Sequence, residues 1–210
     1  MTSWVRGTRS CGPGLKFGTC LLVAVTLISA TALSQSVAID TMHSSVTVRV
    51  YKSGLFSAFA HNHVIQAPIA SGSLDAKKQS VELSFNVSNM KVVDPEGSDS
   101  ERKEIEDTMK GPAVLDLAKF PVISFASSSV TASGLGHYQV NGALNLHGAS
   151  HQISFPVVQS GERYSGSVKL KQTDYGITPI KIAGGSVSVK DEITLEVNIV
   201  PVPGAGGSTP

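Results

Sequence analysis

The sequence predicts an all-β domain of about eight antiparallel strands that follows an N-terminal leader. Two observations lead to this fold class. Apolar and polar residues alternate in short segments between residues 46 and 199, and turn-forming residue pairs separate those segments. An alternation with a period of two is typical of a half-buried antiparallel strand, and many short strands at this spacing form a sandwich or a barrel.

The leader, residues 1–34, contains the three regions of a secretory signal peptide in their usual order. Three basic residues and no acidic residue precede an apolar run at 21–28, and small residues follow at 29–34. The apolar run is shorter than the ~20 residues that cross a bilayer as a stable anchor. We therefore expect cleavage after Ala32 or Ser34 and a periplasmic or secreted location, with an uncleaved N-terminal anchor as the alternative.

Without the leader, the charge and the cysteine content of the chain change. The whole chain has 17 basic and 16 acidic residues, whereas the body has 14 basic and 16 acidic residues, a formal charge of −2. A nucleic-acid partner normally requires a basic patch, so we expect none. Cys11, Cys20 and Trp4 all lie in the leader. A body without cysteine excludes a disulfide scaffold, a thiol enzyme and a cysteine-ligated metal site.

The alternating segments give the expected strands in chain order. They are 46–50, 81–87, 122–130, 138–146, 153–157, 168–170 and 193–199. The expected turns between segments are Ser71-Gly72, Asp94-Pro95, Ser133-Gly134, His147-Gly148, Ser160-Gly161 and Gly184-Gly185. Gly142 and Gly166 lie inside strand patterns, where glycine favours the bulges and bends that a closed barrel requires.

One segment, 99–110, has helical character. Asp99 or Ser100 can cap its beginning, and Gly111-Pro112 ends it. A single short helix in an all-β chain most plausibly covers one end of a barrel. Residues 201–210 contain almost nothing to bury, and we expect a disordered tail.

Six segments, in order, are similar to the YceI family of exported, lipocalin-like proteins that bind lipids or polyisoprenoids. They are 44–48; 55–63; 114–125, close to the family pattern "vLd…kyPxixF"; 140–148, close to "vxGxLtlhG"; 173–177, close to "xdFGI"; and 189–193. Each segment is weak evidence alone, but the ordered set covers about residues 37–200.

The resemblance implies an extended antiparallel eight-stranded, lipocalin-like β-barrel with one short capping helix. It also implies an elongated apolar lumen that carries or sequesters an isoprenoid or other long-chain lipid. Burial of such a chain is favourable by about 0.8 kcal/mol per methylene, so binding needs no catalytic group. We expect no enzyme activity, no cofactor, only transient membrane contact for ligand exchange, and a monomer or homodimer. No G-x-S-x-G, P-loop or H-E-x-x-H motif occurs.

The expected ligand contacts are mainly residues that strand parity turns inward. They are Phe56, Phe59, Leu83, Phe85, Ile123, Phe125, Leu144, Phe155 and Tyr175. The alternative is that these side chains fill a solid core, in a structural or interaction protein without a ligand. Phe120 precedes a proline at a strand entrance and more plausibly closes one end of the barrel. Tyr175 combines an apolar ring with a polar tip, which suits a ligand contact at the mouth.

His61 and His63 stand two residues apart in an extended segment, so both imidazoles point to one side. They are candidates for hydrogen bonds to a ligand headgroup, or for a structural or surface role. The alternative is a metal-binding or redox-linked protein, since paired histidines on one strand face occur in zinc and copper sites. Candidates for a third metal ligand are His43, His137, His147, His151 or a carboxylate. The spacing of His147 and His151 fits a helical zinc pair, but the expected turn between them removes that geometry.

Overall fold

The computed structural model describes residues 36–53, 62–75, 77–182 and 187–203. The chain divides into two compact units, Met1–Leu33 and Ser34–Pro210, and all described residues belong to the second unit. The expected signal peptide therefore lies outside the described residues.

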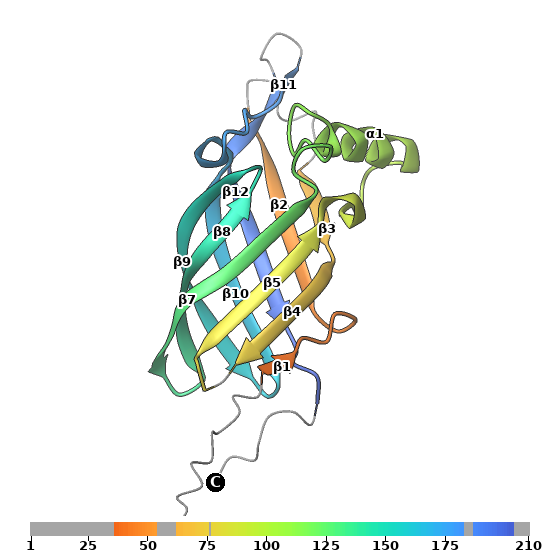
Figure 1. Ribbon diagram of the computed structural model, residues 1–210. Helices are drawn as coiled ribbons and strands as arrows, with labels where there is room; N and C mark the ends of the chain where they lie inside the picture. The colour runs from red at the N-terminus through yellow and green to blue at the C-terminus, as the bar shows by residue number, and fades with distance from the viewer. Residues whose placement is uncertain (1–35, 54–61, 76, 183–186, 204–210) are drawn as a thin grey trace, which may run out of the picture. The chain divides into compact units, whose positions relative to one another are not determined.

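The second unit is built around one antiparallel sheet of 12 strands (Figure 1). The strands are β1 (Ser36–Ala38), β2 (Ser45–Ser53), β3 (His63–Ala67), β4 (Ile69–Asp75), β5 (Ser80–Asn86), β6 (Lys91–Val92), β7 (Val122–Gly134), β8 (His137–Leu146), β9 (Ala149–Ser160), β10 (Arg163–Lys171), β11 (Lys181–Ile182) and β12 (Val187–Ile199). The helical elements are η2 (Val87–Asn89), α1 (Asp99–Lys110) and η3 (Gln172–Tyr175). The sheet order is β1-β4-β5-β7-β8-β9-β10-β12-β2-β3-β6, and β11 pairs with β12.

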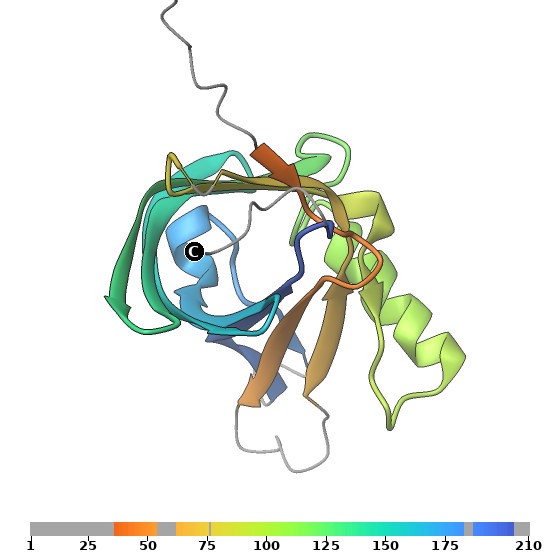
Figure 2. The same ribbon diagram turned by 90° about the horizontal axis from the view of Figure 1, so that it is seen from below.

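The sheet curls into a barrel because β3 and β4 are two halves of one extended segment. Their junction is Pro68, and β3 pairs with β2 whereas β4 pairs with β5. Proline has no amide N–H to offer a ladder, so it suits the corner at which the segment changes partners. Counted in this way, eight strands form the wall and β1, β6 and β11 are short additions. Figure 2 shows, from below, the strands of the wall curving around a common axis. The expected antiparallel barrel is confirmed, although its sheet contains 12 strands in place of the eight expected.

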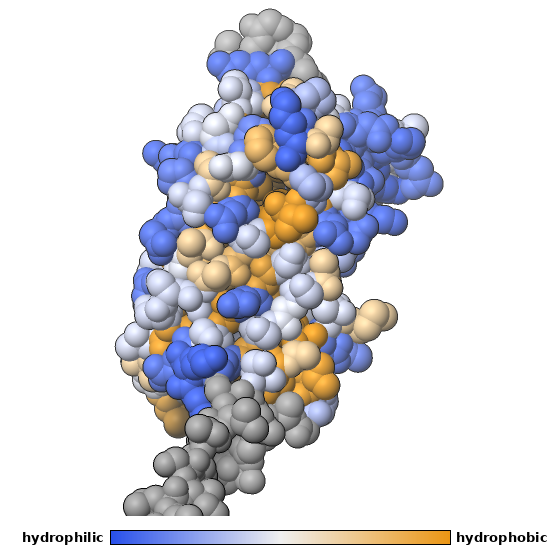
Figure 3. Space-filling model, viewed as in Figure 1, coloured by the Kyte–Doolittle hydropathy of each residue, from blue (hydrophilic) through white to orange (hydrophobic). Residues whose placement is uncertain are grey.

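Strand β12 shows why this sequence forms a barrel wall. Ile193, Leu195, Val197 and Ile199 line the interior. Glu196, between them, faces outward and accepts a hydrogen bond from Arg49 Nε at 2.7 Å. Apolar residues therefore occupy one face of the strand, and the polar or charged residues Thr194, Glu196 and Asn198 the other, as the alternation predicts. Figure 3 shows the outer surface, on which apolar side chains lie scattered between polar ones.

The expected turn at Ser71-Gly72 is wrong, because both residues lie inside β4. The register of β4 against β5 shifts between Ile69 and Ser71, so the segment contains an irregularity and not a reversal. A Cβ atom on Gly72 would lie 2.8 Å from Ile39 Cδ1. Glycine suits position 72 because Ile39, in the segment after β1, packs close to the backbone of β4. It does not mark a chain reversal.

The predicted helix is present as α1, but its N-cap is Ser98 and not Asp99 or Ser100. The Ser98 hydroxyl accepts from the Glu101 amide at 3.3 Å, and the Glu101 carboxylate accepts from the Ser98 amide at 2.8 Å. This reciprocal pair is a capping box. Gly111 is the C-cap, as expected. The helix lies beside the upper end of the barrel (Figure 1) and buries Met109.

Two residues assigned to the disordered tail take part in the fold. Pro201 forms an antiparallel bridge with Ile39, and the Val202 amide donates to the Ala38 carbonyl at 2.9 Å. Residues 204–210 lie outside the described part of the chain. Among the described residues, no helix is both long and apolar enough to span a membrane.

Candidate functional site

The barrel interior contains two apolar cavities, one above the other along the barrel. The upper cavity, near α1 and η3, has a volume of about 150 Å³. The lower cavity, near β1 and the β4–β5 turn, has a volume of about 320 Å³. Every strand of the barrel wall supplies apolar side chains to one cavity or both, because the inward face of each strand is apolar.

Four residues line both cavities and form what we call the waist. They are Leu83, Phe125, Phe155 and Val197. The rings of Phe125 and Phe155 are tilted at 56° with their centroids 6.0 Å apart. The two cavities therefore meet at a pair of phenylalanine rings contributed by β7 and β9.

Glycines on the neighbouring strands make room for these rings. A Cβ atom on Gly142 would lie 2.5 Å from Phe125 Cζ, and one on Gly166 would lie 3.3 Å from Phe155 Cδ2. The β7–β8 register shifts next to Gly142, between Ser127 and Ser129, so the bulge expected there is confirmed. Pairing of β10 with β9 ends at Gly166, although pairing with β12 continues to Lys171.

The structure places seven of the expected ligand contacts on the cavities. Phe85, Ile123, Leu144 and Tyr175 line the upper cavity, and Leu83, Phe125 and Phe155 line both. Phe56, Phe59 and His61 lie outside the described residues. The alternative of a solid core does not fit this interior, because the inward side chains surround open volume.

Sequence reasoning missed several lining residues. Tyr138 and Tyr164 line the lower cavity together with the buried Asp75. Tyr138 has the inward parity of Val140 and Leu144, so alternation alone could have identified it. Burial raises the pKa of Tyr164, and the adjacent Tyr138 raises it further. The lower cavity is thus the more polar of the two.

His63 lies apart from both cavities. Its Nδ1 atom is 2.7 Å from Asp94 Oδ2, and the other oxygen of Asp94 accepts from the Val64 amide at 2.6 Å. Asp94 is buried, so this pair fixes the chain after β6 to the beginning of β3. Within the described ranges, no group of three or more His, Cys, Asp or Glu side chains could hold a metal ion. The metal-binding alternative gains no support from the described residues.

His147 and His151 flank Tyr175 instead of forming a metal pair. His147 and Gly148 have positive φ angles of 50° and 76°, so they form the expected turn between β8 and β9. His147 Nδ1 is 3.0 Å from the Tyr175 carbonyl oxygen, and the Phe120 ring packs edge-on against the His147 ring at 4.7 Å. This packing places Phe120 at the upper end of the barrel.

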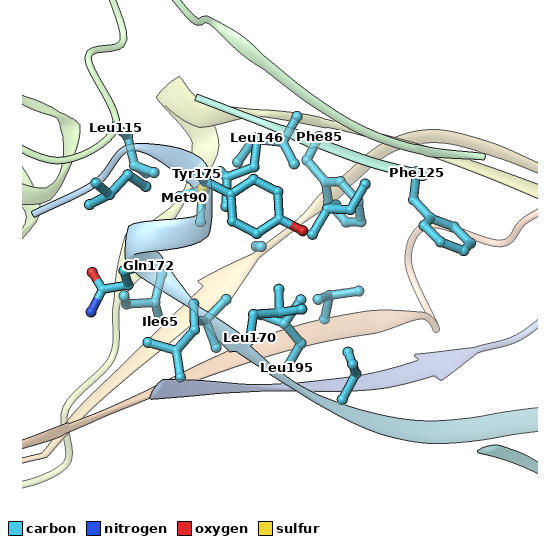
Figure 4. A pocket seen from close by; sticks show the side chains of 18 of the residues that line it. Ile65, Phe85, Met90, Leu115, Phe125, Leu146, Leu170, Gln172, Tyr175 and Leu195 are labelled. Atoms are coloured by element: carbon cyan, nitrogen blue, oxygen red, sulfur yellow. The ribbon is translucent and has the colours of Figure 1, made fainter. Parts of the chain in front are cut away.

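Tyr175 brings a phenol group into the upper cavity. The residue is 2% exposed, and its hydroxyl has no hydrogen-bond partner among the described residues. Figure 4 shows the ring extending from η3 into the cavity, with the hydroxyl directed toward the side on which Phe125 lies. Burial raises the pKa of this phenol, and Asp174 raises it further. The mouth position expected for Tyr175 is therefore an interior one.

The remaining polar residues of the upper cavity, Lys171 and Gln172, are turned to other contacts. The Gln172 amide nitrogen donates to the Lys190 carbonyl at 2.8 Å, and Figure 4 shows that amide on the side opposite to the Tyr175 hydroxyl. Lys171 is exposed. A lumen of this composition favours the transfer of an apolar compound from water.

Comparisons with known proteins agree with this architecture. Residues 38–200 match the family model described as YceI-like domain. The UPF0312 proteins of Shewanella putrefaciens and Shewanella oneidensis are each 27% identical to this chain over 195 residues, covering 84% of this chain and 93% of theirs. The crystal structure of Burkholderia cenocepacia BcnA superposes with a TM-score of 0.56 at 19% identity, over 78% of this chain and 99% of that one. The match to the family model covers most of the chain, and the chain therefore belongs to the YceI-like family.

Proposed function

We propose that this protein is an exported carrier that sequesters an isoprenoid or other long-chain lipid in the barrel lumen and catalyses no reaction. The observation that carries the proposal is the pair of apolar cavities that meet at the waist inside one barrel. A lipid chain that occupies both cavities passes beside the Phe125 and Phe155 rings, which are in contact with each other.

The cavity sizes support a ligand of this class. The lower cavity, at about 320 Å³, is in the range of small-ligand pockets, which runs from roughly 300 to 1,000 Å³. The upper cavity, at about 150 Å³, is comparable to apolar cavities that stay dry and bind small apolar compounds. Each methylene moved from water into this interior contributes about 0.8 kcal/mol, so a chain that extends across the waist gains affinity with length.

The leader supports an export compartment as the location of this function. Residues 1–34 have the pattern of a secretory signal peptide, so we propose that the barrel acts in the periplasm or outside the cell. A lipid tail in such an aqueous compartment needs an apolar container, and loading or unloading requires only transient contact with a membrane.

A matched pair of valine variants tests the proposal. Val168 on β10 lines the upper cavity, whereas Val158 on the adjacent β9 is 44% exposed and lines neither cavity. We expect Val168→Phe to fill part of the upper cavity and to weaken binding of a fluorescent polyprenyl probe by about tenfold, which corresponds to about 1.4 kcal/mol. Val158→Phe should leave the affinity unchanged.

Thermal unfolding of both variants shows whether each barrel is folded before the titration. Equal probe affinity in folded Val168→Phe and Val158→Phe would place the probe outside the upper cavity. Failure of the wild-type protein to take up any long-chain probe would contradict the proposal as a whole.

A further inference from the structure

The Tyr175 hydroxyl is fixed in position by the elements around it. Gly176 follows with a positive φ of 71°, and its amide bonds back to the Gln172 and Thr173 carbonyls, which ends η3. The Tyr175 carbonyl is 3.0 Å from His147 Nδ1, and the His151 ring stands edge-on to the phenol ring at 5.0 Å. The backbone of Tyr175 is therefore held by η3 and His147, and the phenol ring cannot turn toward another part of the wall without losing its contact with His151.

A buried hydroxyl without a partner is unusual. Roughly 90% or more of buried polar groups in folded proteins are hydrogen-bonded, because an unpaired group loses its bonds to water. The described residues offer Tyr175 Oη no partner, although its ring is held inside a cavity that can admit a ligand. The partner is then expected on the molecule that fills the cavity.

The surroundings define the charge of that partner. Burial raises the pKa of Tyr175, so the phenol stays protonated at neutral pH and can donate its hydrogen. An anionic group beside it would be buried against apolar side chains, and the cationic lining residue among the described ones, Lys171, is exposed. Burial of an ion without a partner is strongly unfavourable, so a neutral oxygen fits this position and a phosphate or carboxylate does not.

We propose that Tyr175 donates a hydrogen bond to a neutral acceptor oxygen, such as a ketone, quinone, amide or ester carbonyl, on an otherwise apolar long-chain ligand. This contact selects such ligands over plain hydrocarbons and sets how far the chain extends into the lumen. The inference rests on the proposed function, which supplies the long-chain ligand.

Two probes of equal length test the contact: methyl undecyl ketone and tridecane, each competing with the fluorescent polyprenyl probe. The wild-type protein should bind the ketone about fivefold more tightly, the effect of one neutral hydrogen bond. Tyr175→Phe removes only the hydroxyl and should abolish this preference while leaving tridecane affinity unchanged. The carbonyl stretch of the bound ketone should lie at lower frequency in the wild-type complex than in the Tyr175→Phe complex.

Tyr51→Phe is the matched control, because Tyr51 on β2 lines neither cavity and carries the same chemical change. It should keep the ketone preference. Equal affinities for the two probes in the wild-type protein, or a preference that survives Tyr175→Phe, would overturn the inference and leave lipid binding intact. Loss of the ketone preference in Tyr164→Phe but not in Tyr175→Phe would also overturn the inference, because it would place the ketone carbonyl in the lower cavity. Absence of binding of either probe would overturn the proposed function and this inference with it.

Discussion

At the scale of single residues, the lumen depends on glycines that stand beside phenylalanine rings. Gly142 is the clearest case, since a Cβ atom there would lie 2.5 Å from Phe125 Cζ and 2.6 Å from the Ala126 carbonyl oxygen. The glycine thus lets a large ring occupy the waist without displacing the strand beside it. The size of the waist therefore depends on both Gly142 and Phe125.

Gly142→Ala should therefore destabilise the barrel by about 1–3 kcal/mol, the usual effect of overpacking a core. The double variant Gly142→Ala/Phe125→Leu should recover part of the loss, because the smaller side chain relieves the ring contact and leaves the carbonyl contact. Gly97→Ala is the control, since a Cβ atom there meets nothing closer than 3.6 Å. Urea unfolding checks all three, and equal stabilities of Gly142→Ala and Gly97→Ala would contradict the account.

Asp94 is the second residue on which local structure depends. Its carboxylate is buried, bonds to the Val64 amide and is 2.7 Å from His63 Nδ1, and its carbonyl accepts from Arg102 Nη1 at 2.7 Å. The residue thus connects β3, the chain after β6 and the beginning of α1.

Asp94→Ala should cost about 1–3 kcal/mol, because the buried Val64 amide loses its acceptor. His63→Gln should cost less, because the carboxylate and its bond to Val64 remain. Chemical unfolding of the two variants gives the comparison. A larger loss in His63→Gln than in Asp94→Ala would contradict the assignment of the carboxylate as the central group.

At the scale of elements, alternation predicts those strands that have one apolar and one polar face along their whole length. The faces of β5, β9 and β12 follow directly from Leu83, Phe155 and Leu195 and their neighbours two residues away. Strands β3 and β4 could not be predicted in this way, because Pro68 and Gly72 interrupt them and resemble turn residues. Their pairing depends on a corner that exists only once the barrel closes.

The candidate site was also only partly predictable from alternation. Strand parity predicts which side chains turn inward, including Phe125 and Leu144. Whether they surround a cavity or fill a core depends on the volume enclosed by the whole wall, which no local pattern contains. The waist is a contact between β7 and β9, and the unpartnered hydroxyl of Tyr175 depends on what surrounds η3. The contact between His63 and Asp94 joins residues 31 positions apart in the sequence, so no local pattern predicts it.

We expect the attachment of α1 to depend on pH through Glu106. A hydrogen bond from Lys110 lowers the pKa of Glu106, and the Val92 amide, which donates to Glu106 Oε2 at 3.2 Å, lowers it further. A lowered carboxyl pKa stabilises the folded state above the unfolded pKa of about 4.3, and this contribution is lost as the pH falls through the lower folded value.

We therefore expect the amide hydrogen of Val92 to lose protection against exchange, relative to the core strands, as the pH falls from about 5 to about 3. Glu106→Gln should reduce this protection already at neutral pH and remove its pH dependence. Comparison with Leu144 on β8, whose amide environment lacks a carboxylate partner among the described residues, corrects for global unfolding. Unchanged protection at Val92 throughout this range would contradict the role of Glu106.

At the scale of the whole molecule, the barrel is a container whose inside is apolar along its length and whose outside mixes charged, polar and apolar residues. The closure at Pro68 leaves a continuous wall, and the waist joins an almost wholly apolar upper cavity to a lower cavity with Tyr138 and Tyr164. The arrangement supports binding of a long ligand lengthwise, with a polar group at a defined depth. It requires no reactive side chain.

The most direct test of lipid binding is native mass spectrometry of the wild-type chain purified, without added lipid, from the periplasmic or secreted fraction in which we propose that it acts. The account predicts a folded species heavier than the bare polypeptide by the mass of one long-chain lipid, released as a neutral molecule on activation. Val168→Phe should show less of this species, and Val158→Phe an unchanged amount. The bare polypeptide mass in every preparation, together with no uptake of the polyprenyl probe, would contradict the account.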